Sequence, residues 1–375
     1  MTLSNTSDFF RRKRNISEIK SEVLVPFVES WFGAHQASSG GGAVSNALYL
    51  DLTLGFAGHD VASSAIPIRL LHAVYRTRGS RLDLNDSLET FFFDPDREAL
   101  TLLKEVLEAQ PFYDKLVHQP VILDDEATSA LLQERLASKP AALAFLDPFA
   151  DSYLQEMLLQ LIRHEADLFM LLDFEKLEKV LISRKVDTLI QEIFGEHLDL
   201  IKAYYKAYRD TTRREDFVMN CLEAIFRDKG YTVFLFRINL PDRKQSSHYL
   251  LFASKVDLAY NKLKEIMLRY SDYQEDGVPL FGANLQHKQM TLFQEHYRFS
   301  IESLMKDLLQ NAREYNNMAL QQVYEKHSIG THYILENYKQ AYERLLRLGK
   351  VRFINPKTGH AISKPTYTSK IRYST

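Results

Sequence analysis

Short apolar runs alternate with segments of helical periodicity through the middle of the chain. Apolar runs at residues 47–54, 90–93, 120–123, 141–146 and 167–172 are each followed by a stretch in which apolar residues recur every three or four positions. Parallel strands need helical crossovers, so five such units in succession predict a mostly parallel sheet with helices on both faces.

Two β-like runs come after a purely helical stretch at residues 185–229. These runs, residues 231–238 and 248–253, are separated by a polar, turn-rich segment, and we expect them to pair as an antiparallel hairpin. Five parallel units closed by a hairpin match the Rossmann-like plan of class I methyltransferases, whose final strand runs antiparallel at one side of an otherwise parallel sheet. The predicted fold class is therefore α/β and methyltransferase-like, with residues 185–229 as a helical insert.

The two ends of the chain are predicted to be helical. Residues 17–35 have helical periodicity, and a Gly/Ser-rich stretch at residues 37–43 indicates a linker. Residues 317–359 read as helix, turn, helix and β-wing, which resembles a winged helix. We therefore expect an N-terminal helical segment (1–36), an α/β domain (43–285) and a C-terminal helical and winged-helix domain (286–375).

Composition narrows the class of protein. The net charge is −2, so no whole-molecule field attracts nucleic acid or a membrane, and any such attraction needs a local patch. The single cysteine, Cys221, excludes a disulfide framework and a multi-cysteine metal site within the chain, and the histidines lack metal-ligand spacing. No stretch of about eighteen uncharged apolar residues occurs. We expect a cytoplasmic protein without a membrane segment or metal site.

Acidic residues follow the second and third predicted strands. In doubly wound sheets, ligands bind beyond the carboxyl ends of the strands at the point where strand order reverses. Asp94 is expected to accept hydrogen bonds from the ribose hydroxyls of a nucleoside cofactor, and Asp124 or Asp125 to bind its adenine amino group. The alternative for Asp94 is a helix N-cap before Pro95.

The first and fourth predicted strands complete the predicted site. The first ends at Asp51, a predicted cofactor-binding residue, and continues into a loop whose small residues would let the backbone approach a nucleoside cofactor. The fourth ends in an Asp-Pro-Phe loop, a form of the Asp-Pro-Pro-Tyr-like loop with which amino-methylating enzymes hold their target; a helix N-cap is again the alternative for its aspartate. The predicted residues are Gly55, Gly58 and Asp60 at the methionine end of S-adenosylmethionine, and Asp147, Pro148 and Phe149 at the methyl acceptor.

Several segments together resemble the three-Cys-motif partner protein family. They are residues 9–22, the loop at residues 51–58, residues 147–149, residues 251–255 after the hairpin, and the C-terminal winged helix. The resemblance covers nearly the whole chain. It implies a methyltransferase-like protein that is often encoded beside a radical-SAM-like three-cysteine protein, and that neighbour would be a physical partner.

The chain departs from this family in the first loop. The family loop reads Asp-Leu-Phe-Ala-Gly-Pro-Gly, whereas here Thr53, Leu54 and Gly55 are inserted and His59-Asp60 replaces the final Pro-Gly. A carboxylate there adds bulk and negative charge beside the carboxylate of the cofactor, unless it contacts the methionine amine. The alternative prediction is therefore a degenerate pocket that has lost the cofactor.

The C-terminal segment is strongly basic. From residue 344 to the end the chain has eight Lys or Arg residues and no Asp or Glu. On a winged helix such a run is expected to contact phosphates of DNA or RNA, and the alternatives are a solvated tail or a surface for an acidic protein. The predicted contacts are Arg344, Arg347, Lys350, Arg352 and Lys357.

Two functions agree with these patterns. The first is an S-adenosylmethionine-dependent methyltransferase that acts on or with nucleic acid. The second is a catalytically degenerate nucleic-acid-binding or scaffolding subunit of a multi-protein system, such as one for antiphage defence.

Overall fold

The computed structural model describes residues 8–12, 14, 16–39, 46–54, 66–239, 247–285 and 299–374. The described chain forms two compact units, Asp8–Met267 and Leu268–Thr375. The division falls before residue 286, where the sequence places the start of the C-terminal domain.

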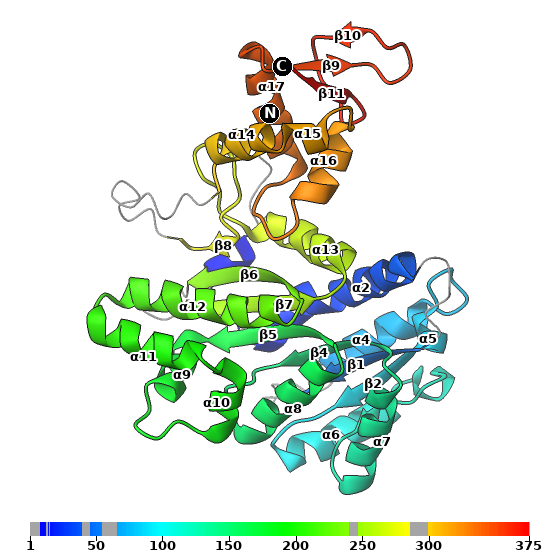
Figure 1. The fold of residues 1–375 in the computed structure, drawn as a ribbon. Helices are drawn as coiled ribbons and strands as arrows, with labels where there is room; N and C mark the ends of the chain where they lie inside the picture. Colours follow the sequence, from blue (N-terminus) through cyan, green and yellow to red (C-terminus); the bar gives the residue numbers. More distant parts are fainter. Residues whose placement is uncertain are drawn as a thin grey trace. The chain divides into compact units, whose positions relative to one another are not determined.

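The first unit is built on a mixed, mostly parallel sheet (Figure 1). Strands β3, β2, β1, β4 and β5 are neighbours in that order and run parallel, whereas β7 is antiparallel to both β5 and β6. The predicted hairpin is confirmed, and its antiparallel strand β7 lies between β5 and β6, at one side of the parallel strands. The strands are β1 (Ala47–Asp51), β2 (Leu88–Phe92), β3 (Val121–Ile122), β4 (Ala141–Leu146), β5 (Asp167–Asp173), β6 (Thr232–Asn239) and β7 (Ser247–Ser254).

Helices cover both faces of this sheet (Figure 1). On one face, a single apolar cluster joins alternate strand residues such as Leu48, Leu50 and Met170 to the helices α7 (Glu126–Ala137), α8 (Ser152–Arg163), α9 (Phe174–Leu181), α10 (Thr188–Phe194) and α12 (Thr211–Asp228). The opposite face carries α2 (Val25–Ser38), α4 (Ile66–Arg76) and α13 (Asp257–Met267). The remaining helices of this unit are η1 (Asp8–Arg11), α5 (Leu84–Ser87), α6 (Arg97–Glu108), η3 (Tyr113–Lys115) and α11 (His197–Ala207).

The predicted N-terminal helix is confirmed, with one irregular turn. It comprises α1 (Ile16–Ile19), the π-helical turn η2 (Lys20–Leu24) and α2, and the backbone N–H of Val25 donates to the carbonyl of Lys20 five residues earlier. Pro26 follows immediately, and a proline lacks an N–H and crowds the carbonyl four residues before it. The wide turn lets the helix continue past this proline and directs Lys20 toward the sheet.

The second unit is a winged helix. Its helices pack around a separate core that includes Leu304, Leu320, Leu345 and Phe353. Strand β9 lies between β10 and β11 in a three-stranded antiparallel sheet. The elements are η4 (Leu268–Tyr270), β8 (Gly282–Ala283), α14 (Ile301–Gln310), α15 (Ala312–Tyr315), α16 (Leu320–His327), α17 (Leu335–Arg347), β9 (Val351–Ile354), β10 (Ala361–Ile362) and β11 (Lys370–Tyr373).

Candidate functional site

Asp51 ends β1 at the carboxyl edge of the sheet, and Lys20 binds it there. Lys20 Nζ lies 2.6 Å from Asp51 Oδ1, donates to the carbonyl of Thr53 and sits 4.2 Å from the centroid of the Phe145 ring. Both side chains are fully buried. Burial lowers the pKa of Lys20 and raises the pKa of Asp51, and their mutual attraction opposes both shifts.

One oxygen of Asp51 is left over. Oδ2 is buried and accepts no hydrogen bond from the part of the chain that the structure describes. A buried acceptor without a donor is costly, and such atoms often mark a place where a ligand donates. The strand end therefore combines an ion pair with a buried acceptor, Asp51 Oδ2, and the charge of this carboxylate also acts on the buried Tyr49 hydroxyl.

Asp94 follows β2 on the same edge of the sheet. Its Oδ1 accepts from the backbone N–H of Asp96, 3.0 Å away, and its charge acts on both Lys20 and Asp51. The N-cap of α6 is Asp96, whose Oδ1 accepts from the backbone of Glu98. The alternative prediction, that Asp94 is the N-cap, is thus wrong. The carboxylate of Asp94 is half-exposed and does not cap the helix.

The two carboxylates after β3 have different surroundings. Asp125 caps α7, because its Oδ1 accepts from the backbone N–H of Thr128 at 2.8 Å and the Thr128 hydroxyl lies 3.3 Å from the Asp125 backbone N–H, in a capping box. These hydrogen bonds hold the pKa of Asp125 below its ordinary value. Asp124 is exposed. Of the two, Asp124 has the carboxylate that the helix end does not use.

The loop after β4 is buried. The backbone N–H of Asp147 donates to Thr53 Oγ1 at 3.1 Å, so the ends of β4 and β1 are joined. Asp147 Oδ1 accepts from the backbone of Phe149, and its Oδ2 lies 3.5 Å from Lys176 Nζ. Burial raises the pKa of the Asp147 carboxyl. The helix that follows is capped by Asp151, so the N-cap alternative for Asp147 is also wrong.

The other residues predicted for this edge either are buried or lie outside the described residues. The Phe149 ring is 5% exposed and packs 6.1 Å from the ring of Phe194, and Pro148 is buried beside it. Gly55, Gly58 and Asp60 lie outside the described residues. The structure thus places Asp51, Asp94 and Asp147 at the carboxyl edge of the sheet. Phe149 lies in the core.

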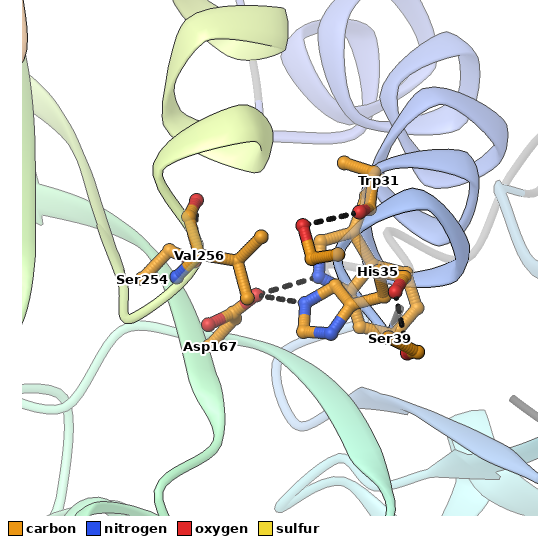
Figure 2. Close-up of polar contacts among 8 residues, drawn as sticks. Trp31, His35, Ser39, Asp167, Ser254 and Val256 are labelled. Carbon is orange, nitrogen blue, oxygen red and sulfur yellow. Dashed lines mark hydrogen bonds and ion pairs between the residues drawn. The ribbon is translucent and has the colours of Figure 1, made fainter. Parts of the chain in front are cut away.

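A second polar cluster anchors α2 at the opposite, amino edge of the sheet. Figure 2 shows Asp167, the first residue of β5, facing Trp31 and His35. Asp167 Oδ2 accepts from the Trp31 indole at 2.7 Å and lies 2.8 Å from His35 Nε2. Ser39 Oγ donates to the carbonyl of His35 at 2.7 Å. The N-terminal helical segment is therefore tied to the sheet by polar contacts at both edges.

Sequence patterns contained signals for both anchors. Lys20 occupies the apolar stripe that continues through Leu24, Phe27 and Trp31, a position where a charge needs a buried partner. Trp31 and His35 are four residues apart and so share a helix face. The partner carboxylates were not identifiable from spacing alone, since each comes from a distant strand.

The basic residues predicted to bind phosphate lie on the exterior of the second unit. Arg344 and Arg347 are exposed on the last turns of α17, and Lys350, Arg352 and Lys357 are exposed on and around β9. Among the residues that the structure describes, none of these five side chains forms an ion pair with a carboxylate. In contrast, Glu336 near the start of α17 pairs with Lys339 at 3.4 Å.

Strand register concentrates positive charge on one face of the winged-helix sheet. Arg352 of β9 is directly opposite Arg372 of β11, and Lys370 lies two residues from Arg372 on the same face. All three are exposed, while Val351, Phe353 and Ile371 on the other face are buried. Like charges directly opposite each other destabilise a sheet. The face defined by Arg352, Lys370 and Arg372, called the basic sheet face below, is thus suited to an anion.

Other kinds of site find no support in the described part of the chain. It holds no group of three or more His, Cys, Asp or Glu side chains that could bind a metal ion. Cys221 is buried in α12, and burial raises the pKa of its thiol, which disfavours the reactive thiolate. No helix in the described part of the chain is long and apolar enough to cross a membrane.

The two units define an α/β domain with a mixed, mostly parallel sheet and a winged helix–turn–helix domain. Residues 283–358 match the family model of the GMT-like wHTH domain. The match ends before β10, so β10 and β11 complete the winged-helix sheet beyond it. No curated protein sequence matches the chain. The matched domain suggests nucleic-acid binding and is compatible with binding to DNA.

Proposed function

We propose that the chain is an S-adenosylmethionine-binding, methyltransferase-like protein that acts on or with nucleic acid. The observation that carries the proposal is the order of the seven strands of the first unit, β3-β2-β1-β4-β5-β7-β6, of which β7 alone runs against the others. This is the strand plan of class I methyltransferases. The order reverses beside β1, where a doubly wound sheet binds its ligand, and Asp51 and Asp94 stand at that point.

The residues present fit the cofactor in its adenosine half. Asp94 would accept from the ribose hydroxyls, and Asp124 would accept from the adenine amino group, since neither carboxylate caps a helix. The unpartnered Oδ2 of Asp51 would accept from the methionine ammonium. When bound, the cofactor supplies an activated methyl group on sulfur. The chain's own contribution would be alignment, with Asp147 orienting an acceptor amine.

Calorimetric titration of the full chain with S-adenosylmethionine tests this proposal. We expect binding that Asp94→Ala weakens by about tenfold or more, because a hydrogen bond to a charged group contributes about 1.5–3 kcal/mol. Asp96→Ala is the matched control, since it removes a carboxylate two residues away that caps α6. Absence of heat at millimolar cofactor, or equal losses in both variants, would contradict cofactor binding at this edge.

Nucleic-acid binding is assigned to the basic sheet face of the winged helix. The N-terminal half of α17 mixes Glu336 with Lys339, whereas the basic sheet face has no carboxylate, so we expect contacts mainly to phosphates. Arg352→Gln with Arg372→Gln should reduce the salt slope of duplex binding by about 1.8, at about 0.9 for each lost phosphate contact. The control is Lys306→Gln with Lys326→Gln, two exposed lysines already paired with Glu302 and Glu314. An equal slope change in both double variants would count against the assignment.

One observation favours the second candidate function, a scaffold that binds nucleic acid without methyl transfer. Lys20 already pairs with Asp51, and Phe149 is withdrawn into the core, so part of the edge is committed to structure. A degenerate chain would bind nucleic acid through the basic sheet face and give no heat with the cofactor. The two titrations above therefore separate the candidates. Antiphage defence and a partner encoded nearby remain hypotheses under either function.

A further inference from the structure

A groove on the first unit is lined by other residues than those of the carboxyl edge. It is formed by one face of α4 and by residues 110–115, and its volume is about 470 Å³. Residues 110–115 lead into β3, so this wall stands toward the amino edge of the sheet, whereas Asp51 and Asp94 stand at the carboxyl edge. The volume lies within the range of small-molecule sites, roughly 300–1,000 Å³.

Hydrogen bonds fix the second wall of the groove. The backbone N–H of Lys115 donates to the carbonyl of Phe112 at 3.0 Å, and the N–H of Tyr113 donates to that of Gln110 at 3.0 Å. The side chain of Asn85 donates to the carbonyl of Lys115 at 3.4 Å. The opposite wall is the regular helix α4. Both walls are therefore formed before any ligand binds, which lowers the entropic cost of binding.

The floor of the groove is aromatic. Phe112 is 7% exposed, and its ring is stacked on that of Tyr75 with centroids 6.0 Å apart and planes at 20°. The His72 ring lies 5.5 Å from the Phe112 ring. Tyr75 is half-buried and His72 exposed, so their rings reach the groove surface. Such a floor suits a flat aromatic ring such as a nucleobase, because every base has a π-face that can stack on an aromatic side chain.

The rim of the groove is cationic. Arg69 and Lys115 are exposed, and His72 lies three residues from Arg69 on the same side of α4. None of the residues that line the groove is acidic. Within the described part of the chain, neither Arg69 nor Lys115 has an ion pair, and Arg69 donates to the Ser21 hydroxyl. This charge pattern is complementary to an anionic ligand.

We propose that the groove binds a nucleoside phosphate, with the base against Tyr75 and His72 and the phosphate at the rim formed by Arg69 and Lys115. A flat floor beside separate cations matches the two parts of a nucleotide. The ligand is either a free mononucleotide or one nucleotide of a single strand. None of the residues that line the groove belongs to the carboxyl edge or to the basic sheet face.

The experiment uses the full chain carrying Arg352→Gln and Arg372→Gln, so that the basic sheet face does not contribute. Adenosine monophosphate is titrated by calorimetry, and a fluorescent single-stranded oligonucleotide of about twelve nucleotides by anisotropy. Arg69→Glu with Lys115→Glu tests the rim, and Tyr75→Ala tests the floor. The matched control is Lys104→Glu with Lys229→Glu, two exposed lysines outside the groove. Thermal melting verifies that every variant is folded.

We expect the rim variant to abolish mononucleotide binding, and Tyr75→Ala to weaken it about tenfold. On the oligonucleotide, the rim variant should lower the salt slope by about 1.4, at about 0.7 for each phosphate contact on a single strand. Losses with the oligonucleotide alone would assign the groove to a strand, and losses with the mononucleotide alone to a free nucleotide. Binding of neither probe, or equal losses in the rim and control variants, would overturn the proposal.

Discussion

At the scale of single residues, Lys20 and Asp51 show how a charge is accommodated in an apolar interior. Both side chains are fully buried, and they meet at 2.6 Å beneath the N-terminal helix. Each ion loses its hydration on folding, so the pair itself contributes little net stability, whereas either ion alone would be strongly unfavourable. The two residues should therefore behave as a unit when they are changed.

Lys20→Met is expected to lower the free energy of unfolding by about 3–5 kcal/mol, because it leaves the Asp51 carboxylate buried without a counter-ion. The measurement is urea denaturation followed by the fluorescence of Trp31, the single tryptophan, which is buried in α2. The double variant Lys20→Met with Asp51→Asn should recover much of the loss. A double variant as unstable as Lys20→Met alone would show that the pair is not coupled.

Lys264 gives a prediction for the pH dependence of stability. It is buried in α13, and burial lowers its pKa from 10.5 to about 7. Between these values the unfolded chain holds a proton that the folded chain has lost, so stability rises with pH, by up to about 1.4 kcal/mol per unit. Below pH 7 both states are charged and the contribution is constant.

Lys264→Met lacks this titration. Urea denaturation of both proteins at pH 6.5 and above pH 8 should show the native chain gaining stability relative to the variant as the pH rises. A difference between the two proteins that stays constant across this range would mean that Lys264 keeps its proton in the folded state.

Residue roles at the strand ends were only partly predictable. An aspartate after a strand and before a helix is compatible with a ligand contact and with a helix cap. Asp96 and Asp125 are the N-caps of α6 and α7, so the carboxylates of Asp94 and Asp124 are the ones that could bind a ligand. The sequence places all four within a few residues of the edge, but the hydrogen bonds that separate them exist only in the folded chain.

At the scale of elements, the capping box of α7 allows the roles of Asp124 and Asp125 to be distinguished by experiment. Asp125→Ala removes the side-chain acceptor for Thr128 and should lower the thermal midpoint of the first unit by about 2–3 °C. Asp124→Ala should leave the midpoint unchanged, because Asp124 has no part in the cap, and weaken cofactor binding instead. Equal midpoints for the two variants would show that the cap contributes nothing to this unit.

Element positions followed from the sequence where local and tertiary signals agree. The predicted bounds of β4, residues 141–146, coincide with those observed. The place of β7 between β5 and β6 was not predictable, since a hairpin pattern fixes which strands pair with each other but not which of them adds to the sheet. The π turn at Lys20–Leu24 also has no periodic signature beyond Pro26.

At the scale of the whole molecule, the two units have separate hydrophobic cores. Leu345→Ala creates a cavity in the winged-helix core and should destabilise that unit by about 2–5 kcal/mol. Far-ultraviolet circular dichroism should then show an early transition, while the Trp31 fluorescence transition, which reports the first unit, stays in place. A shift of both transitions by the same amount would show that the chain unfolds as one cooperative body.

The opposed Arg352 and Arg372 give salt two contrary effects on the winged helix. Counterions shield the repulsion between these guanidinium groups and so favour the folded sheet, yet the same counterions compete for the phosphates that the sheet is proposed to bind. Conditions that release nucleic acid would make the domain more resistant to heat. A polyanion would reconcile the two, acting as ligand and as the missing counter-charge, so that the domain is completed electrostatically by what it binds.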